Sequence, residues 1–169
     1  YEIEFNKVET NKTTQNTVPW QPKVVRSGED ITIVATSIMV LEAIRAAAHL
    51  EDEFGISCEV LDLQSTTNFD FKAILDSVTK TNKLLIADTS WAPYGVSSEI
   101  VRLICETDPG LLKKPIKSVG MKFVPCPTGK NLEDEFYPSI RTIAEEVLTI
   151  VEPRRTGQLP SGESYRDYY

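Results

Sequence analysis

The side chains most often used in catalysis are few in this sequence and far apart. His49 is the single histidine, and it falls late in a predicted helix, away from the strand ends where a catalytic triad would be assembled. We expect it to be a surface residue that complements the helix dipole. Cys58, Cys105 and Cys126 are too scattered for a zinc site, which needs three or four converging ligands. The sequence therefore predicts no catalytic residue, no cofactor-binding residue and no metal ligand.

Two short motifs resemble known signatures but fail on spacing. "PCPTGKN" (125–131) ends like a phosphate-binding loop, yet Val124 stands where the first glycine of such a loop is required. "YGVSSEI" (94–100) resembles a nucleophile elbow, but neither Ser97 nor Ser98 is followed by the closing glycine. Neither motif is taken as a site of phosphate binding or acyl transfer.

The segment "TSWAPYG" (89–95) is better explained as a protein-contact segment than as a catalytic one. It places Trp91 and Tyr94 on a predicted loop that Pro93 stiffens, and exposed aromatic residues on such loops are common interface anchors. Alternatively, one ring folds back and covers the end of the sheet. The candidate contact residues, including two from a later proline-rich loop, are Asp88, Trp91, Tyr94, Pro125 and Pro127.

An anion site is a second candidate at the same place. A helix is predicted to begin near Gly95, and the unpaired N–H groups of a helix N-terminus attract anions. The candidate anion-binding residues are Gly95, Val96 and Ser97. Asp88 ends the preceding predicted strand without the paired acids of a phospho-acceptor domain. We expect its carboxylate to accept hydrogen bonds from nearby backbone N–H groups.

Strands and helices alternate along the sequence, which is typical of a three-layer α/β/α sandwich with a mostly parallel sheet. Apolar strands are predicted over 31–36, 57–63, 83–88 and 116–120, and helices follow each of the first three. Gly55 is expected to end the first helix, and Asn68 or Asp70 to cap the second. Pro138 is expected at the first position of a last helix. "KVVR" (23–26) either forms a hairpin with the next strand or lies elsewhere in the sheet.

The composition of the chain argues against some classes of binding partner. The net charge is −7 and there is no run of Lys or Arg, so nucleic acid is not expected, and no apolar run is long enough to cross a membrane. Three widely spaced cysteines favour a reducing, cytoplasmic location. We divide the chain into an N-terminal arm (1–22), one domain (23–151) and a C-terminal tail (152–169). We expect it to be a piece of a longer protein.

The ordered motifs of the middle of the chain resemble one family. "SVTKTNKLLIADTSWAPYGVSSEI" (77–100) is similar to the C-terminal domain of the beta subunit of thiamine-diphosphate-dependent 2-oxo acid dehydrogenases, the first components of pyruvate and branched-chain complexes. That family has a Ser-Val-x-Lys-Thr helix end, an acid-terminated strand, a Trp-containing loop and Gly-Val-x-x-Glu-Ile. "KVVRSGEDITIVAT" (23–36), "GISCEVLDL" (55–63) and "VPCP" (124–127) extend the resemblance over most of the chain.

The resemblance implies a transketolase C-terminal fold with five strands, one of them antiparallel, and "KVVR" is the strand we assign to that role. It implies that thiamine diphosphate and Mg bind outside this domain, so that the fragment alone is inactive. The implied partners are the upstream thiamine-binding domain, an alpha subunit, a second beta-type subunit and the acyltransferase core. The implied role is assembly and docking. Alternatives are another transketolase-like enzyme, a free-standing anion-binding regulatory domain, or an interaction module using Trp91, Tyr94 and the Tyr165–Tyr169 tail.

Overall fold

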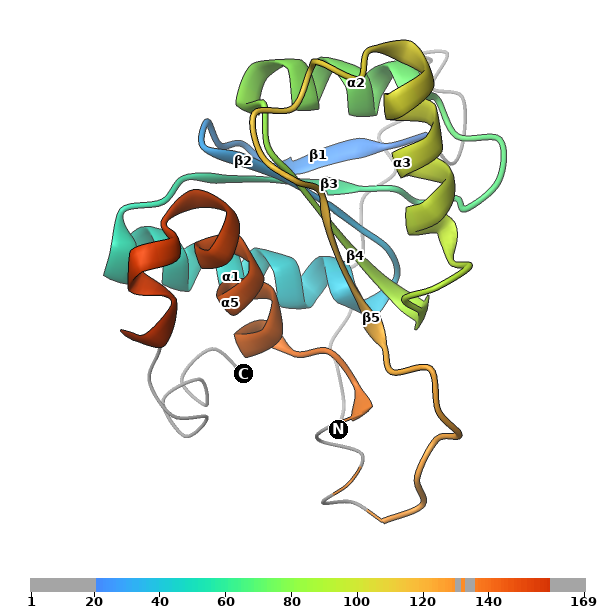
Figure 1. Ribbon diagram of the computed structural model, residues 1–169, viewed down its shortest axis with the longest axis vertical. Helices are drawn as coiled ribbons and strands as arrows, with labels where there is room; N and C mark the ends of the chain where they lie inside the picture. Colours follow the sequence, from blue (N-terminus) through green and yellow to red (C-terminus); the bar gives the residue numbers. More distant parts are fainter. Residues whose placement is uncertain (1–20, 130–131, 133–135, 159–169) are drawn as a thin grey trace, which may run out of the picture.

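The computed structural model describes residues 21–129, 132 and 136–158. In that part of the chain, strands and helices alternate around one sheet (Figure 1). Most of the predicted arm and residues 159–169 of the tail, including Tyr165–Tyr169, lie outside the described residues. The elements are β1 (Lys23–Arg26), β2 (Ile31–Ala35), α1 (Ile38–Phe54), β3 (Cys58–Asp62), α2 (Phe71–Thr81), β4 (Leu84–Trp91), α3 (Val96–Thr107), β5 (Lys117–Met121), α5 (Ile140–Val151) and the 3-10 helix η1 (Pro153–Gln158).

The five strands lie in the order β1-β3-β2-β4-β5. β1 pairs with β3 in the antiparallel sense, and all other pairs are parallel, which confirms the predicted mostly parallel sheet with one antiparallel strand. Lys23–Arg26 is that strand, as expected. Of the two alternatives for it, the hairpin is wrong, because β1 pairs with β3 and not with β2.

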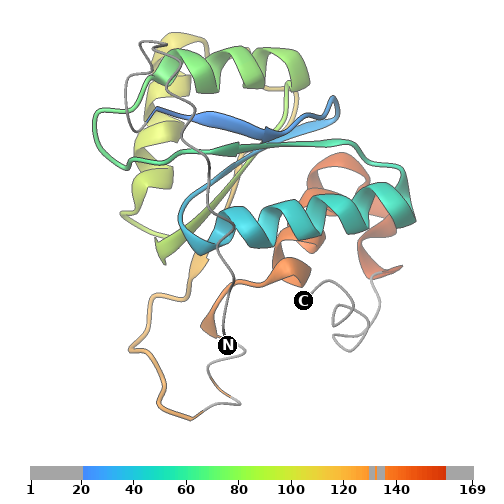
Figure 2. The ribbon, with the colours of Figure 1, turned by 180° about the vertical axis from the view of Figure 1, so that it is seen from behind.

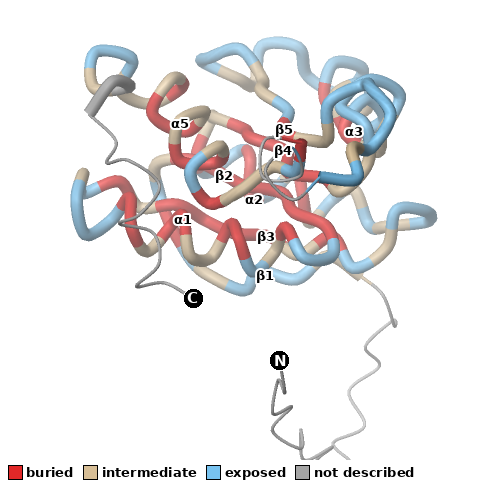
Figure 3. Tube along the Cα trace, turned by 90° about the horizontal axis from the view of Figure 1, so that it is seen from below, coloured by how far each residue is buried: buried red, intermediate tan, exposed pale blue. Residues whose placement is uncertain are grey.

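Helices cover both faces of the sheet and make the predicted three layers. α1 and α5 pack on one face and α2 and α3 on the other (Figures 1 and 2). In β2, Ile33 belongs to the core cluster beneath α1 and α5, whereas Val34 belongs to the cluster beneath α2 and α3. All five residues of β2 are buried, as expected for a central parallel strand that is covered on both faces. Figure 3 shows the buried strands between the helices.

Two of the predicted helix ends are confirmed and one is wrong. Gly55 ends α1 with a left-handed backbone, φ 67°, and the Asp70 carboxylate caps α2 by accepting from the N–H of Lys72 at 3.0 Å. α5, however, begins at Ile140 rather than Pro138. Ser139 is its N-cap, because Ser139 and Thr142 form a capping box that satisfies the first backbone N–H groups.

His49 is not the surface residue that the sequence suggested. It is only 3% exposed, and its ring packs edge-on against Phe54, with 6.1 Å between centroids. Residues 153–158, which were predicted to belong to an irregular tail, form η1, and Arg155 places its guanidinium 4.7 Å from the centre of the Phe54 ring at the end of α1. None of the helices in the described ranges is long and apolar enough to cross a bilayer.

Candidate functional site

β4 is longer than its apolar core predicts. It extends to Trp91, which pairs with Met121 of β5, and the Ala92 N–H donates to the Met121 carbonyl at 3.2 Å. The prediction that Trp91 lies on a loop is therefore wrong. The polar residues Thr89 and Ser90 interrupt the apolar pattern, so the sequence does not reveal that the strand continues to Trp91 and pairs there with β5. The turn that connects β4 to α3 consists only of residues 92–95.

The turn after β4 is tight, and the side chain of Tyr94 projects from it into solvent. Tyr94 has φ 68°, an uncommon conformation for a bulky side chain, and its side chain is 89% exposed. Gly95 has no room for a side chain, because an added Cβ would lie 2.3 Å from Ser90 Oγ and 2.9 Å from the Trp91 carbonyl oxygen. Strained residues of this kind are found where the surrounding structure fixes a functional geometry.

Asp88 lies on the buried side of this turn and helps to fix its position. It is 6% exposed, and its carboxylate accepts hydrogen bonds from Thr36 Oγ1 at 2.9 Å and from Ser90 Oγ. The expected backbone N–H donors are thus replaced by two hydroxyl donors, one from the end of β2 and one from β4. Since Asp88 is buried, its contribution to any interface is to hold the strand ends in place.

Three aromatic side chains gather at the end of β4. Trp91 and Phe123 meet edge to face, with 4.9 Å between ring centroids, and Tyr94 lies 6.1 Å from Phe123. The exposed fraction is 47% for Trp91, 58% for Phe123 and 89% for Tyr94. We call these three residues the aromatic surface. Neither Trp91 nor Tyr94 is buried over the sheet, so the geometry favours the contact interpretation over the covering one.

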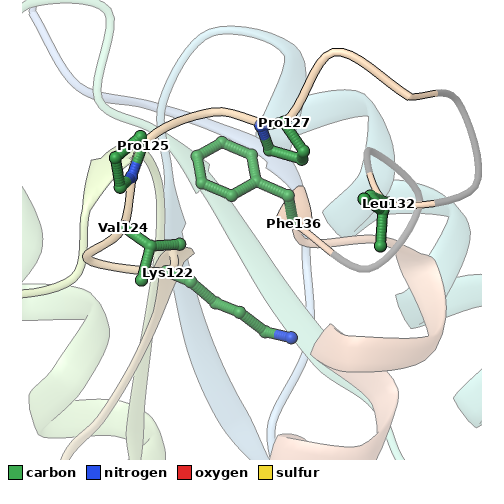
Figure 4. Close-up of a pocket in the computed structure, with 6 residues that line it drawn as sticks. All are labelled: Lys122, Val124, Pro125, Pro127, Leu132 and Phe136. Carbon is green, nitrogen blue, oxygen red and sulfur yellow. The ribbon is translucent and has the colours of Figure 1, made fainter.

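A hollow adjoins the aromatic surface on the loop that follows β5. It has a volume of about 180 Å³, and we call it the proline hollow; its lining residues are Lys122, Val124, Pro125, Pro127, Leu132 and Phe136. Figure 4 shows the Phe136 ring lying between the two prolines. Phe136 is 5% exposed and forms the floor, while Val124 is half exposed.

The end of the proline-rich loop is fixed to the body of the domain. Glu42 of α1 is largely buried, and its Oε2 accepts from the Ile140 N–H at the start of α5, at 3.1 Å. A carboxylate at a helix N-terminus is favourable to the helix dipole. The predicted contact residues Pro125 and Pro127 follow Phe123 on the same loop and line the proline hollow, and Asp88 alone of the predicted contact set is buried.

The candidate anion site has its helix N-terminus but also a built-in negative charge. Ser97 is 3% exposed and Val96 is half-buried, so these two residues of the first turn of α3 face the core rather than solvent. Asp88 Oδ2 would lie 2.9 Å from a Cβ on Gly95, the N-cap residue. Since like charges repel, this carboxylate disfavours an external anion at the same helix end.

The three cysteine side chains differ in burial and in reactivity. Burial raises the pKa of the Cys58 thiol to about 12, so it stays protonated and unreactive at neutral pH. Cys126 is exposed, with Sγ 3.4 Å from Tyr137 Oη. All three cysteines are free thiols. Within the described residues, no three His, Cys, Asp or Glu side chains converge closely enough to hold a metal ion.

The amino-acid sequence matches a known domain family. The family model for the transketolase C-terminal domain matches residues 21–143. The chain therefore belongs to the transketolase C-terminal domain family, as the resemblance of its motifs indicated. This domain is part of larger enzymes.

Two curated relatives of the chain are beta subunits of the pyruvate dehydrogenase E1 component. The chain is 34% identical over 152 residues to the mitochondrial pyruvate dehydrogenase E1 component subunit beta of Saccharomyces cerevisiae, covering 89% of this chain and 42% of that protein. It is 38% identical over 130 residues to the same subunit of Rickettsia felis, covering 77% of this chain and 40% of that protein. The chain thus spans about two fifths of the length of these relatives.

A solved structure has the same architecture. It is a split-gene transketolase in an inactive beta4 tetramer, and it aligns with a TM-score of 0.63 at 27% identity over 79% of this chain and 43% of that one. The Saccharomyces relative is mitochondrial by name and the Rickettsia relative carries no such word. The cytoplasmic location expected from the cysteines stays a prediction.

Proposed function

We propose that the chain is the non-catalytic C-terminal domain of a beta-type subunit in a thiamine-diphosphate-dependent 2-oxo acid dehydrogenase, acting on pyruvate or a branched-chain 2-oxo acid. Its role is to assemble and dock subunits. One observation carries this role. Six of the ten exposed large hydrophobic residues in the described chain belong to two neighbouring segments, 91–94 and 123–137. A concentration of exposed apolar side chains marks a protein-contact surface.

In the proposed enzyme, catalysis takes place outside this domain. Thiamine diphosphate and Mg bind in the upstream domain and the alpha subunit, which supply the catalytic groups. The relatives, more than twice as long as the matched segment, support an upstream part, since this chain covers 42% and 40% of them. We retain an arm (1–22), a domain (23–151) and a tail (152–169) as the working division.

The proposed partners are the upstream domain, the alpha subunit, a second beta-type subunit and the acyltransferase core. Support for the second beta-type subunit comes from the solved relative, which is a beta4 tetramer. We place the protein in a reducing compartment, the cytoplasm first, because its three thiols are free.

The test uses the full-length parent protein purified with its partner subunit. We expect reduction of ferricyanide that depends on a 2-oxo acid and on added thiamine diphosphate with magnesium, and no turnover by the 169-residue chain alone. A panel of pyruvate and branched-chain 2-oxo acids names the substrate. Turnover by the 169-residue chain alone, or an intact assembly with no activity on any 2-oxo acid, would contradict the proposal.

A further inference from the structure

A second pocket lies at the carboxyl ends of the central parallel strands and shares no lining residue with the proline hollow. Its volume is about 520 Å³, which is within the range of small-molecule sites. Its lining residues follow or end three neighbouring strands: 36–37 after β2, 64–66 after β3 and 88–89 in β4. We call it the strand-end pocket.

The strand-end pocket lies where the connections of the sheet diverge. From β2 the chain continues into α1 on one face, and from the adjacent parallel strand β4 it continues into α3 on the opposite face (Figures 1 and 2). Connections that diverge in this way leave a crevice at the carboxyl ends of the strands, and open α/β sheets generally bind their ligands there. The position of the pocket is therefore the one at which such a sheet most often holds a small molecule.

Two exposed residues of the pocket have backbones that are uncommon for residues other than glycine. Ser37 has φ 51° and Gln64 has φ 56°. Such conformations cost free energy and cluster at ligand-binding segments. Ser37 also occupies the N-cap position of α1 without making a capping hydrogen bond, whereas Asp70 and Ser139 cap α2 and α5 with their side chains. The helix therefore does not use the Ser37 hydroxyl, which remains available to a ligand.

Asp88 supplies a buried carboxylate to the pocket. It is 6% exposed, and it accepts hydrogen bonds from the hydroxyls of Thr36, at 2.9 Å, and Ser90. A carboxylate has room for about four hydrogen bonds, so these two donors leave part of its capacity unused. Among the described residues, no Lys, Arg or His side chain forms an ion pair with Asp88. The carboxylate is thus suited to a ligand that donates hydrogen bonds.

The other side chains of the pocket narrow the chemistry of this ligand. Five of the seven lining side chains carry a hydroxyl, one is the amide of Gln64, and none is basic. A phosphate or carboxylate ligand would meet the charge of Asp88 with no cation to balance it. Hydroxyls and amides both donate and accept hydrogen bonds, so this lining complements a compound that has several hydroxyl groups and no net charge.

We propose that the strand-end pocket binds a small, uncharged polyhydroxy compound, a free monosaccharide or polyol, with ligand hydroxyls donating to Asp88. Ser37 and Gln64 bond the same ligand from the opening of the pocket. This inference goes beyond the proposed function, because it concerns another site and requires neither a partner subunit nor a 2-oxo acid. Each hydrogen bond to such a ligand replaces one to water, so we expect a dissociation constant in the millimolar range.

The test is a titration of the isotope-labelled 169-residue chain, followed by the NMR chemical shifts of its backbone amides. The neutral probes are D-glucose, D-ribose, myo-inositol and glycerol, and the charged probes are inorganic phosphate and ethanolamine. We expect at least one neutral probe to saturate in the millimolar range and to shift the amides of residues 36–37, 64–66 and 88–89. Neither charged probe should saturate at these residues.

Two substitutions show whether the binding uses the pocket's own polar groups. Asp88→Asn keeps the shape of the side chain but removes its charge, and it should weaken binding at least about tenfold, since hydrogen bonds to charged groups are the stronger ones. Ser37→Ala removes one hydroxyl and should weaken binding about fivefold. Ser98→Ala is the matched control, because it removes an exposed hydroxyl of α3 that lies outside the pocket, and it should leave the affinity unchanged.

The amide spectrum of each variant establishes that it is folded. The inference is overturned if no neutral probe saturates, if the shifted amides lie outside the pocket, or if a folded Ser37→Ala or Asp88→Asn chain binds as wild type does. Saturation by ethanolamine or phosphate alone also overturns it, because the ligand would then be charged. All of these results leave the proposed function standing, since that function is tested by the 2-oxo acid activity of the parent protein.

Discussion

Gly28→Ala is expected to lower the free energy of unfolding by about 3 kcal/mol, because the turn between β1 and β2 lies directly against the backbone of β3. A Cβ on Gly28 would lie 2.2 Å from the carbonyl carbon of Cys58 and 2.3 Å from the amide nitrogen of Glu59. These are main-chain atoms of a strand paired on both sides, which cannot move aside. Urea denaturation followed by circular dichroism measures the effect.

Gly55→Ala is the matched control for this substitution. Gly55 has φ 67°, but nothing lies within 4 Å of its added Cβ. The variant carries only the cost of a left-handed alanine, about 1 to 2 kcal/mol. Equal urea midpoints for wild type and Gly28→Ala would mean that the turn does not rest on β3 in solution.

Lys80→Met is expected to have the second largest effect, about 2 kcal/mol. Glu59 is 4% exposed and accepts hydrogen bonds from Ser77 Oγ at 2.5 Å and from Lys80 Nζ. Ser77 in turn contacts Thr32 Oγ1 at 2.8 Å. Removing the cation leaves a buried carboxylate without its charge partner. Breaking such a pair costs about 3 to 5 kcal/mol when both groups are buried. The Lys80 side chain is 36% exposed, so water reduces the loss.

The effect of Lys80 should depend on pH in a defined direction. The hydrogen bond to Glu59 raises the pKa of Lys80 above its ordinary value. A raised pKa in the folded state means that the contribution is complete below the unfolded pKa, about 10.4, and is lost as the pH rises through the folded value. The stability difference between wild type and Lys80→Met should thus be constant near neutral pH and shrink above about pH 10.4.

Lys72→Met serves as the control on the same helix. Lys72 pairs with Asp76 at 2.5 Å, but both side chains are well exposed, at 73% and 64%. Exposed pairs contribute little, so this variant should unfold at the same urea concentration as wild type. If both lysine variants behave alike, the buried position of Glu59 is not what makes Lys80 important.

Local patterns in the sequence were sufficient for two helix ends: the left-handed Gly55 and the cap at Asp70 each depend on a few neighbouring residues, and each is confirmed. The antiparallel role of Lys23–Arg26 is also confirmed, but it was predicted from the family resemblance and not from the local pattern. The Ser-Val-x-Lys-Thr series of the family resemblance also receives a physical reason. Ser77 and Lys80 both contact Glu59, and Thr81 Oγ1 lies 2.8 Å from Thr32 Oγ1, which joins α2 to the sheet.

Contacts between segments that are far apart in the sequence could not be predicted from local patterns. His49 is buried although its place late in a helix indicated the surface, and η1 forms from residues that show no periodicity. Phe123 completes the aromatic surface, yet it is remote from Trp91 in sequence and meets it only because β4 and β5 are paired. Phe136, the floor of the proline hollow, gives no local signal for the same reason. The exposed aromatic residues after a paired strand end were the signal that did point to this site.

The proposed docking role of the aromatic surface, which takes no part in the chemistry, predicts a specific kinetic effect. In the parent enzyme, Trp91→Ala combined with Phe123→Ala removes two of its three rings but no catalytic group. Subunit association should weaken while each assembled complex keeps its full rate. Thermal unfolding of the double variant provides the check on folding.

The decisive measurement is the rate of 2-oxo-acid-dependent ferricyanide reduction by this double variant as its subunit concentration is raised. We expect the concentration for half-maximal rate to increase at least about tenfold, with the same maximal rate as wild type at saturation. A lower maximal rate at an unchanged half-maximal concentration would contradict the docking role, and would show that the aromatic surface acts in catalysis itself.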